Sequence, residues 1–330
     1  MERTLYIFSK GRLVRRGNTL GLETEAGVRF LPVEAVRDLI VFAEVDFNKK
    51  FVEFLSKHEI LLHYFSHHGY YMGTFYPREH YNSGYVILNQ AAHYLNPDRR
   101  LLIAKAFLIG SIKNMQRVLG YYGRRGADVS RVAASLEANE AQVCTAKGVS
   151  ELLAIEGRAR SAYYSAWDHI LQNPDFAFES RSKRPPLNRI NALLSFLNTL
   201  LYTTVLSEIY KTHLDPRIGY LHETNFRRFS LNLDVAEVFK PIIVDRLIFT
   251  LIGRRMIQAR DFRQDGAGVF LKEGALKTIV EEYEKRLRTT IKVRKLRRSV
   301  SYRRLIRMEL YKVQKHVLGD ETYEPYVSEW

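Results

Sequence analysis

The stretch YYMGTFYPREHYNSGYVILNQAAHYLNPDRRLLIAKAFL, residues 70–108, contains the change in hydrophobic period that decides the fold. Before Pro77 apolar and polar residues alternate, which is typical of β-strands. After it, Asn96 and Pro97 form a helix start, with asparagine as the cap and proline at the first helical position. The sequence therefore predicts a β-rich part and then a helical part, with the boundary near residues 77–90.

Short alternating segments separated by turn residues fill about the first 80 residues. One helix interrupts them, because Phe47, Phe51 and Phe54 fall on one face at helical spacing. Many short strands with one helix favour a small β-sandwich over residues 1–80. The predicted strands are 4–8, 12–16, 19–24, 28–31, 38–42, 61–65 and 70–76.

The remainder, residues 81–330, shows helical periodicity and no convincing strand. We expect an α+β fold, in which the β-sandwich precedes a larger all-α domain. After the helix that starts at Asn96, the predicted helices cover about 128–145, 149–171, 187–211, 235–258 and 270–290.

The charge balance indicates a polyanionic partner. The chain has 51 Lys and Arg against 36 Asp and Glu, a formal net charge of +15. A membrane span is not expected, because the most apolar stretch, 191–210, is interrupted by several polar residues. The start of the chain has no signal-peptide core, and the single cysteine, Cys144, excludes an intrachain disulfide. We expect a cytoplasmic protein that binds nucleic acid.

A carboxylate lies within the apolar face of the predicted helix over 149–171. Glu156 falls between Leu152 and Tyr163 on a helical wheel. A buried carboxylate needs a partner, so Glu156 either pairs with Arg160 one turn later or binds a metal ion. From this pattern alone the ion pair is the commoner outcome.

Two further candidates lie in later segments. His222 follows a loop punctuated by Pro216 and Gly219, and neutral imidazole is a common metal ligand, although an ordinary polar histidine is the simpler interpretation. Asp234 and Glu237 are three residues apart, so they share a helix face. Asp-x-x-Glu before an apolar run also fits a capping box, with Asp234 as cap and Glu237 reaching back. Both interpretations hold in part if Asp234 caps while Glu237 binds metal.

Together these segments offer two carboxylates and one imidazole. Hard carboxylate oxygens with a single imidazole suit Mg²⁺ or Mn²⁺ better than zinc. Phosphodiester chemistry uses such an ion to neutralise charge that develops on the phosphate. Glu156, His222 and Glu237 are therefore candidate catalytic metal ligands and Asp234 is a candidate supporting residue, while the ion pair, the ordinary histidine and the helix cap stay open as alternatives.

Basic residues gather toward the end of the chain. Residues 285–315 contain 13 Lys and Arg and a single acidic residue, Glu309. A cluster of one sign repels itself, which favours an anionic partner, while the alternative is a solvated helix face. We predict sequence-independent contacts to DNA phosphates from Arg227, Arg228, Arg294, Lys295, Arg297, Arg298 and Arg303. The acidic and aromatic end, 319–330, fits either a partner-docking tail or a disordered end.

One histidine cluster does not predict a metal site. His63 falls in a predicted strand, and His67 and His68 fall in the turn that follows it. Neither these nor His80 has an acidic residue or cysteine placed to complete a zinc site. The chain also lacks a glycine-rich phosphate loop, a dinucleotide fingerprint and a nucleophile elbow.

In this order, the motifs resemble the CRISPR-associated integrase, the first of the numbered CRISPR-associated protein families. Residues 4–8, 30–33 and 70–79 resemble its β-sandwich, and 184–186 with 191–196 resemble its central helix. Three segments resemble its ligand motifs, and Lys240 stands where an arginine is commoner. These segments are EGRAR (156–160), LDPRIGYLH (214–222) and LDVAEVFKP (233–241).

The resemblance implies a metal-dependent DNA integrase and endonuclease of CRISPR adaptation. It implies that the 3′-OH of a short duplex attacks a phosphodiester at the edge of a CRISPR repeat. It also implies a homodimer through the β-sandwich, and assembly with the small second CRISPR adaptation protein. Two alternatives stay open: a structure-selective nuclease that does not integrate, and a non-catalytic scaffold that binds nucleic acid.

Overall fold

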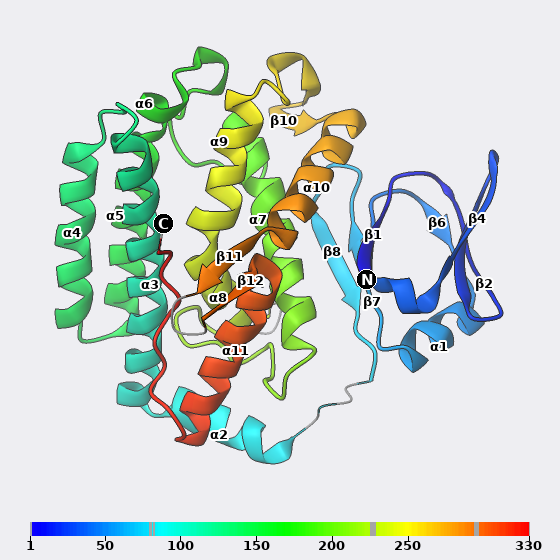
Figure 1. Cartoon of the computed structure of the whole chain (residues 1–330), viewed down its shortest axis with the longest axis horizontal. Coiled ribbons are helices and arrows are strands. Elements are labelled where there is room, and N and C mark those ends of the chain that lie inside the picture. The colour runs from blue at the N-terminus through cyan, green and yellow to red at the C-terminus, as the bar shows by residue number, and fades with distance from the viewer. Residues whose placement is uncertain (1, 79–80, 82, 225–228, 294–296, 330) are drawn as a thin grey trace. The chain divides into compact units, whose positions relative to one another are not determined.

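The computed structural model describes residues 2–78, 81, 83–224, 229–293 and 297–329. The chain divides into two compact units, Met1–Asn82 and Ser83–Trp330. Strands fill most of the first unit and helices dominate the second (Figure 1). The predicted α+β fold class is confirmed.

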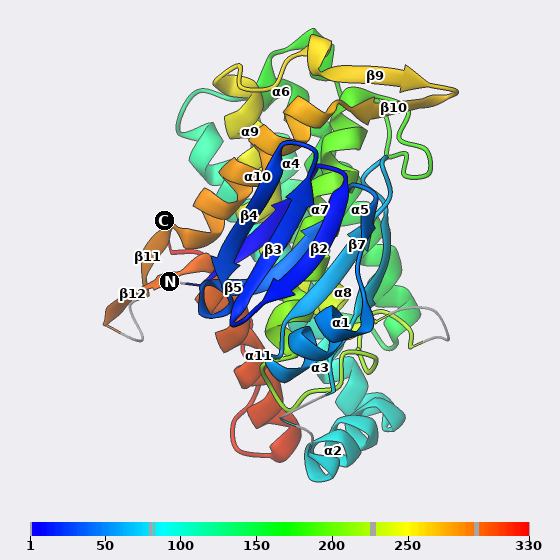
Figure 2. The same cartoon turned by 90° about the vertical axis from the view of Figure 1, so that its right-hand side faces the viewer.

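The N-terminal unit contains two four-stranded sheets (Figure 2). One has the strand order β1-β5-β7-β8 and the other β4-β3-β2-β6. The elements are β1 (Arg3–Ile7), β2 (Gly11–Arg16), β3 (Thr19–Thr24), β4 (Gly27–Pro32), a 3-10 turn (Val33–Ala35), β5 (Val36–Val41), β6 (Val45–Asp46), α1 (Lys49–Lys57), β7 (Leu61–Phe65) and β8 (Tyr71–Phe75).

A shared core joins these two sheets into the predicted sandwich. Leu39 and Leu62 of the first sheet belong to the same buried cluster as Leu13 and Leu20 of the second, with Phe54 of α1. In the first sheet β1, β5 and β7 run parallel, while β8 is antiparallel to β7. Parallel neighbours need crossover connections, which β2, β3 and β4 supply before β5 and α1 supplies before β7.

The C-terminal unit is built from packed helices (Figure 1). In chain order these are α2 (Gly84–Leu95), α3 (Pro97–Gly123), α4 (Ser130–Thr145), α5 (Val149–Ser165), α6 (Trp167–Leu171), a 3-10 turn (Pro174–Phe176), α7 (Arg189–Ile209), α8 (Leu231–Lys240), a π-helical turn (Pro241–Asp245), α9 (Arg246–Gly253), a 3-10 turn (Ala259–Asp261), α10 (Glu273–Arg288) and α11 (Tyr302–Leu318). Asn96 caps α3 as predicted, since its Oδ1 accepts from the backbone N–H of Arg99 at 3.0 Å.

α7 is the central helix of this unit. Among the described residues it is the one helix long and apolar enough to cross a membrane, but 83% of its apolar window is buried inside the fold. A buried apolar helix of this kind is the core of a packed unit. Some of its polar side chains bond inside the fold: Thr204 Oγ1, for example, bonds to the Tyr283 hydroxyl at 2.9 Å.

Several expectations for the second unit are wrong. Two short hairpins occur where no strand was predicted: β9 (Phe262–Asp265) with β10 (Gly268–Leu271), and β11 (Thr290–Val293) with β12 (Arg298–Ser301). The helix predicted over 149–171 breaks at Ala166, where α5 ends and α6 begins. A last helix, α11, was not predicted, because its dense basic charge conceals the apolar face of Leu305, Leu310 and Val313.

Candidate active site

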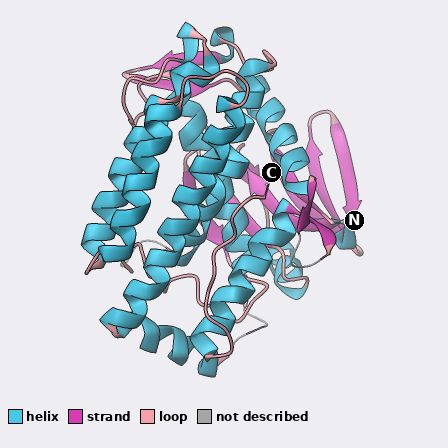
Figure 3. Ribbon diagram, turned by 60° about the vertical axis from the view of Figure 1, so that its left-hand side comes forward, coloured by secondary structure: helices cyan, strands magenta, loops and turns pink. Residues whose placement is uncertain are grey.

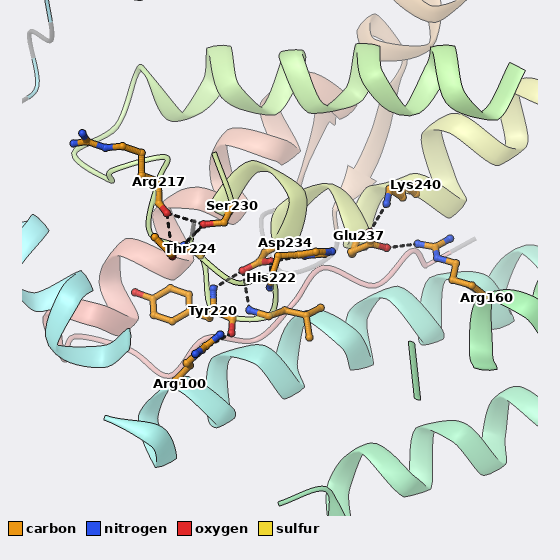
Figure 4. Close-up of polar contacts among 12 residues, drawn as sticks. Arg100, Arg160, Arg217, Tyr220, His222, Thr224, Ser230, Asp234, Glu237 and Lys240 are labelled. Atoms are coloured by element: carbon orange, nitrogen blue, oxygen red, sulfur yellow. Dashed lines mark hydrogen bonds and ion pairs between the residues drawn. The ribbon is translucent and has the colours of Figure 1, made fainter. Parts of the chain in front are cut away.

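Two helices and one loop supply the predicted metal ligands. Glu156 lies on α5 and Glu237 on α8, while His222 lies in the loop between α7 and α8. α8 packs against α3 and α7, which fixes it within the core. Figure 4 shows His222 between Asp234 and Glu237.

Glu237 is buried, with 2% of its surface exposed, and its two oxygens bind two cations. Oε2 accepts from Arg160 Nη2 at 2.6 Å, and Oε1 accepts from Lys240 one turn later. Burial alone would raise the pKa of Glu237, but the charges of Lys240 and Arg160 outweigh burial and hold it well below the usual value. Glu237 is therefore ionised at neutral pH.

Arg160 connects the two predicted glutamate ligands. Its Nε lies 3.5 Å from Glu156 Oε1, its Nη1 lies 3.8 Å from Asp245 Oδ2, and its Nη2 also donates to Ser111 Oγ at 3.2 Å. The i,i+4 pair considered for Glu156 is thus present. However, the same guanidinium also binds Glu237 from a different helix. The Arg160 guanidinium therefore lies between the carboxylates of Glu156 and Glu237 and pairs with both of them.

Asp234 is fully buried and binds the loop that carries His222. Its Oδ2 accepts the backbone N–H groups of Tyr220 at 2.5 Å and Leu221 at 3.0 Å. Its Oδ1 accepts the backbone N–H of His222 at 2.9 Å and lies 2.8 Å from Nδ1 of the same residue. Because a carboxylate can only accept, Nδ1 is assigned as the donor and Nε2 is left to bind a ligand.

The capping-box interpretation of Asp234 and Glu237 is wrong. α8 begins at Leu231, so Asp234 lies a full turn inside the helix, and no side chain caps its start. The Asp234 carboxylate therefore turns toward the loop of residues 220–222. Glu237 binds Arg160 and Lys240 and does not reach back to the helix start.

The side chains of Glu156, Glu237 and His222 offer the types of donor atom that a divalent cation binds. Two carboxylates and one imidazole nitrogen are the ligands that Mg²⁺ and Mn²⁺ accept. In the described part of the chain, no three His, Cys, Asp or Glu side chains stand close enough to hold an ion in their present positions. In these positions Arg160 and Lys240 bind the oxygens of Glu237. The glutamates must turn from Arg160 for both of them to bind an ion.

Comparisons with known proteins identify the family of this chain. The family model of CRISPR associated protein Cas1 matches residues 5–285. The chain belongs to the Cas1 family. A CRISPR-associated endonuclease Cas1 from Thermodesulfovibrio yellowstonii is 51% identical over 330 residues, and the match covers both chains completely.

Solved structures place the same fold in this family. A Cas1 protein from Thermotoga maritima is 48% identical to this Cas1 chain, with a TM-score of 0.91, and the match covers 99% of this chain and 100% of that one. A casposase bound to integration product is 18% identical, with a TM-score of 0.88, over 99% of this chain and 94% of that one. The casposase shares the fold.

The arginines that were predicted to contact DNA in this Cas1 chain are not all exposed to solvent. Arg303 is 7% exposed, and its guanidinium pairs with Glu284 at 2.8 Å and with Glu208 at 4.0 Å. Arg303 is therefore occupied inside the fold and is not available to a phosphate. Arg297 and Arg298, by contrast, are exposed at the β11–β12 hairpin. The other four lie outside the described residues: Arg227, Arg228, Arg294 and Lys295.

Two buried residues beside the Cas1 site, Lys240 and Asp245, were not predicted from the sequence to belong to it. Lys240 Nζ lies 5.0 Å from the centroid of the Tyr202 ring and pairs with Glu237. Asp245 is 1% exposed, and burial raises its pKa to about 7. A carboxylate inside the apolar run 241–252 is the same signal that identified Glu156, and it would have identified Asp245.

The histidines that were considered in the N-terminal unit lie in a buried strand and in the turn that follows it. His63 is fully buried in β7, where its Nδ1 lies 2.7 Å from Thr74 Oγ1, and burial lowers its pKa to about 3. His67 and His68 lie at the turn between β7 and β8. His80 lies outside the described residues.

Gly219→Ala is expected to disturb the Asp234 contacts and to destabilise the Cas1 fold. A Cβ at Gly219 would lie 2.9 Å from Asp234 Oδ2 and 2.8 Å from the carbonyl carbon of Ser230. Overpacking of this kind costs about 1–3 kcal/mol, and urea denaturation measures it. Gly157→Ala is the control, because nothing lies within 4 Å of a Cβ there. Equal stabilities of the two variants would contradict the expectation.

Mn²⁺ affinity is expected to fall as the pH falls through the pKa of His222. Burial alone would lower this pKa, but the hydrogen bond to Asp234 and its charge outweigh burial, and the pKa lies above its ordinary value of 6.5. A ligating imidazole must be neutral, so affinity drops about tenfold per pH unit below that pKa. Calorimetry between about pH 5.5 and 8.5 measures this, and His222→Ala should remove the dependence. A pH-independent affinity in the wild type would exclude His222 as a ligand.

Proposed function

We propose that this Cas1 chain is a divalent-metal-dependent DNA endonuclease and integrase of CRISPR adaptation. It inserts short duplexes into a CRISPR array when their 3′-OH attacks a repeat phosphodiester. The observation that carries the proposal is the convergence of Glu156 and Glu237 on one cation, with His222 adjacent and held by Asp234. The curated relative that is 51% identical over the full chain is named an endonuclease, which supports it.

Glu156, Glu237 and Nε2 of His222 would hold Mg²⁺ or Mn²⁺. A bound divalent ion supplies neutralisation of the charge that develops on the target phosphate. The protein's own residues prepare the site: Asp234 orients His222, and Lys240 and Arg160 keep Glu237 ionised. Lys240 and Arg160 also place positive charge beside the ligands, where a phosphate would approach.

DNA binding would rest on the excess of positive charge. The formal charge of +15 attracts a phosphate backbone without regard to sequence. Arg297 and Arg298 are exposed and suited to phosphate contacts. We include Arg227, Arg228, Arg294 and Lys295 on their sequence pattern alone.

We also propose how the units divide the work. The β-sandwich of residues 1–80 would mediate a homodimer, and residues 81–330 would carry the metal and the DNA. The partner would be the small second CRISPR adaptation protein, and the DNA would be a protospacer duplex and a CRISPR repeat. Membership of the Cas1 family supports these roles. A cytoplasmic location accords with them.

A joining assay tests the proposed function. It combines a short labelled duplex, a plasmid that contains a repeat, the partner protein and Mn²⁺. Wild type is compared with Glu156→Ala, His222→Ala and Glu237→Ala, and Glu273→Ala serves as a surface control because Glu273 forms an exposed pair with Lys277. We expect joined product from the wild type and the control only, and only with metal. Nicking without joining would favour the nuclease, and DNA binding without any product would favour the scaffold.

A further inference from the structure

The end of the chain folds back onto the catalytic unit. Gly319, at φ +85°, ends α11 and reverses the chain. The residues that follow run as an extended segment beside the helices (Figures 1 and 3). We refer to residues 323–328 as the strap. It is neither an undocked tail nor a surface loop, since Tyr323 and Ser328 are buried.

A buried carboxylate anchors the start of the strap. Glu309 of α11 is 1% exposed, and its Oε1 accepts from the Tyr323 hydroxyl at 2.7 Å and from the backbone N–H of Tyr326 at 2.9 Å. Lys312 pairs with Glu309 Oε2 at 2.5 Å and donates to the Glu324 carbonyl at 2.6 Å. Two backbone positions and one side chain of this segment are therefore fixed by neighbouring residues of α11.

The other end of the strap reaches α8 through one asparagine. Asn114 of α3 is fully buried, and its Nδ2 donates to the carbonyls of Tyr326 at 2.9 Å and Val238 at 2.8 Å. Its Oδ1 accepts the backbone N–H of Ser328 at 2.8 Å. The Tyr326 ring also stacks on Phe239 with centroids 6.1 Å apart and an interplanar angle of 7°. Val238 and Phe239 directly follow Glu237 in the chain.

The C-terminal turn of α8 depends on contacts with other segments, because the α-helical hydrogen bonding ends there. Pro241 has no N–H, so the carbonyl of Glu237 lacks the donor that a helix supplies four residues later. Beyond Lys240 the hydrogen bonding is π-helical from Pro241 to Asp245. A helix end with interrupted internal bonds depends on tertiary contacts for its exact position.

We propose that the strap is a positioning element that holds the C-terminal turn of α8 and thereby places the Glu237 carboxylate. Its residues touch neither DNA nor metal, and they act through Asn114 and Phe239. The inference concerns the same site as the proposed function and rests on it for its effect on metal binding. Its effect on α8 can be measured without either metal or DNA.

Gly110 allows a sharp test on the full-length chain. A Cβ at Gly110 would lie 2.6 Å from Pro325 Cβ, so Gly110→Ala must displace the strap, whereas the Val238 side chain at 3.4 Å is an ordinary contact. Gly120→Ala on the same helix is the matched control, since the nearest atom would be the end of the Arg124 side chain at 3.7 Å. Alanine favours a helix over glycine at both positions, so propensity alone predicts no loss.

Tyr326 provides a second, milder pair of variants. Tyr326→Ala removes the ring that stacks on Phe239, while Tyr326→Phe keeps it. Both variants retain the backbone bonds to Asn114 and Glu309. If Gly110→Ala fails to fold, this pair decides the question.

Two readouts are compared: amide hydrogen exchange in residues 235–240, and Mn²⁺ affinity by calorimetry. Gly110→Ala should raise exchange in α8 about tenfold or more and weaken Mn²⁺ binding about tenfold, by moving one ligand. Tyr326→Ala should show a several-fold effect on both, with Gly120→Ala and Tyr326→Phe within about twofold of wild type. Unchanged exchange in α8, or lower thermal stability with unchanged Mn²⁺ affinity, would overturn the inference. A wild type that binds no Mn²⁺ would refute the proposed function instead, and exchange would still decide whether the strap holds α8.

Discussion

Glu237→Ala is expected to abolish joining and to destabilise the fold even when no metal is present. The substitution removes a proposed ligand, and loss of one such stabilising group lowers turnover on the order of 10²–10³-fold or more. It also leaves Arg160 and Lys240 buried without the carboxylate that both of them bind. Breaking a buried pair by removal of one partner costs about 3–5 kcal/mol. Urea denaturation in EDTA and the joining assay measure the two effects separately.

The control for Glu237 is a carboxylate whose partner is exposed. Glu273 and Lys277 form an i,i+4 pair at 2.6 Å with both side chains in contact with solvent. Glu273→Ala should therefore change stability by less than about 1 kcal/mol and leave joining intact. Glu237→Gln should recover part of the stability, because an amide oxygen still accepts from Arg160, but it should not recover activity. A Glu237→Ala protein as stable as wild type would contradict the buried network.

Asp234→Ala is expected to have the second largest effect. It removes the acceptor of three backbone N–H groups, from Tyr220, Leu221 and His222, and of the His222 imidazole. Each buried donor left unsatisfied costs about 1–3 kcal/mol. Because His222 also loses the group that orients its ring, Mn²⁺ affinity should fall about 10–100-fold. Denaturation and calorimetry on the same preparation measure both losses.

Asp168 supplies the comparison for Asp234. Its carboxylate accepts a single backbone N–H, from Phe178 at 2.9 Å, in an exposed position. Asp168→Ala should lose no more than about 1 kcal/mol and should keep Mn²⁺ affinity. Asp234→Asn should not rescue the site, because its NH₂ group would face N–H donors. If Asp234→Ala bound Mn²⁺ as tightly as wild type, Asp234 would not be the residue that orients His222.

The N-terminal strands could be predicted because their signal is local. Alternation with turn residues placed most of them, the apolar run 38–42 placed β5, and the two-residue β6 was missed. The parallel pairing of β1, β5 and β7 could not be predicted, since strand order depends on contacts between distant segments. The hairpins of the second unit were missed for another reason. Strands of four residues carry too little alternation, and in β11 and β12 basic residues dilute it further.

Only part of the candidate site could be predicted from the sequence. Glu156, His222 and Glu237 stood out by motif order, and Glu156 also by its place on an apolar face. What the sequence could not indicate is that Arg160 binds both glutamates, because residues 160 and 237 meet only through tertiary packing. For the same reason, Asp234 resembled a helix cap when only the local pattern was considered. The ion pairs of Arg303 with Glu284 and Glu208 likewise could not be predicted from the sequence.

The most direct test of the account is the location of Mn²⁺ in crystals of the full-length protein. Anomalous scattering identifies the ion without any assumption about activity. We expect a peak bound by Glu156, Glu237 and Nε2 of His222, with the Arg160 guanidinium turned away from Glu156, and no such peak in Glu156→Ala crystals. A strong peak elsewhere, with none among these three residues at saturating Mn²⁺, would contradict it.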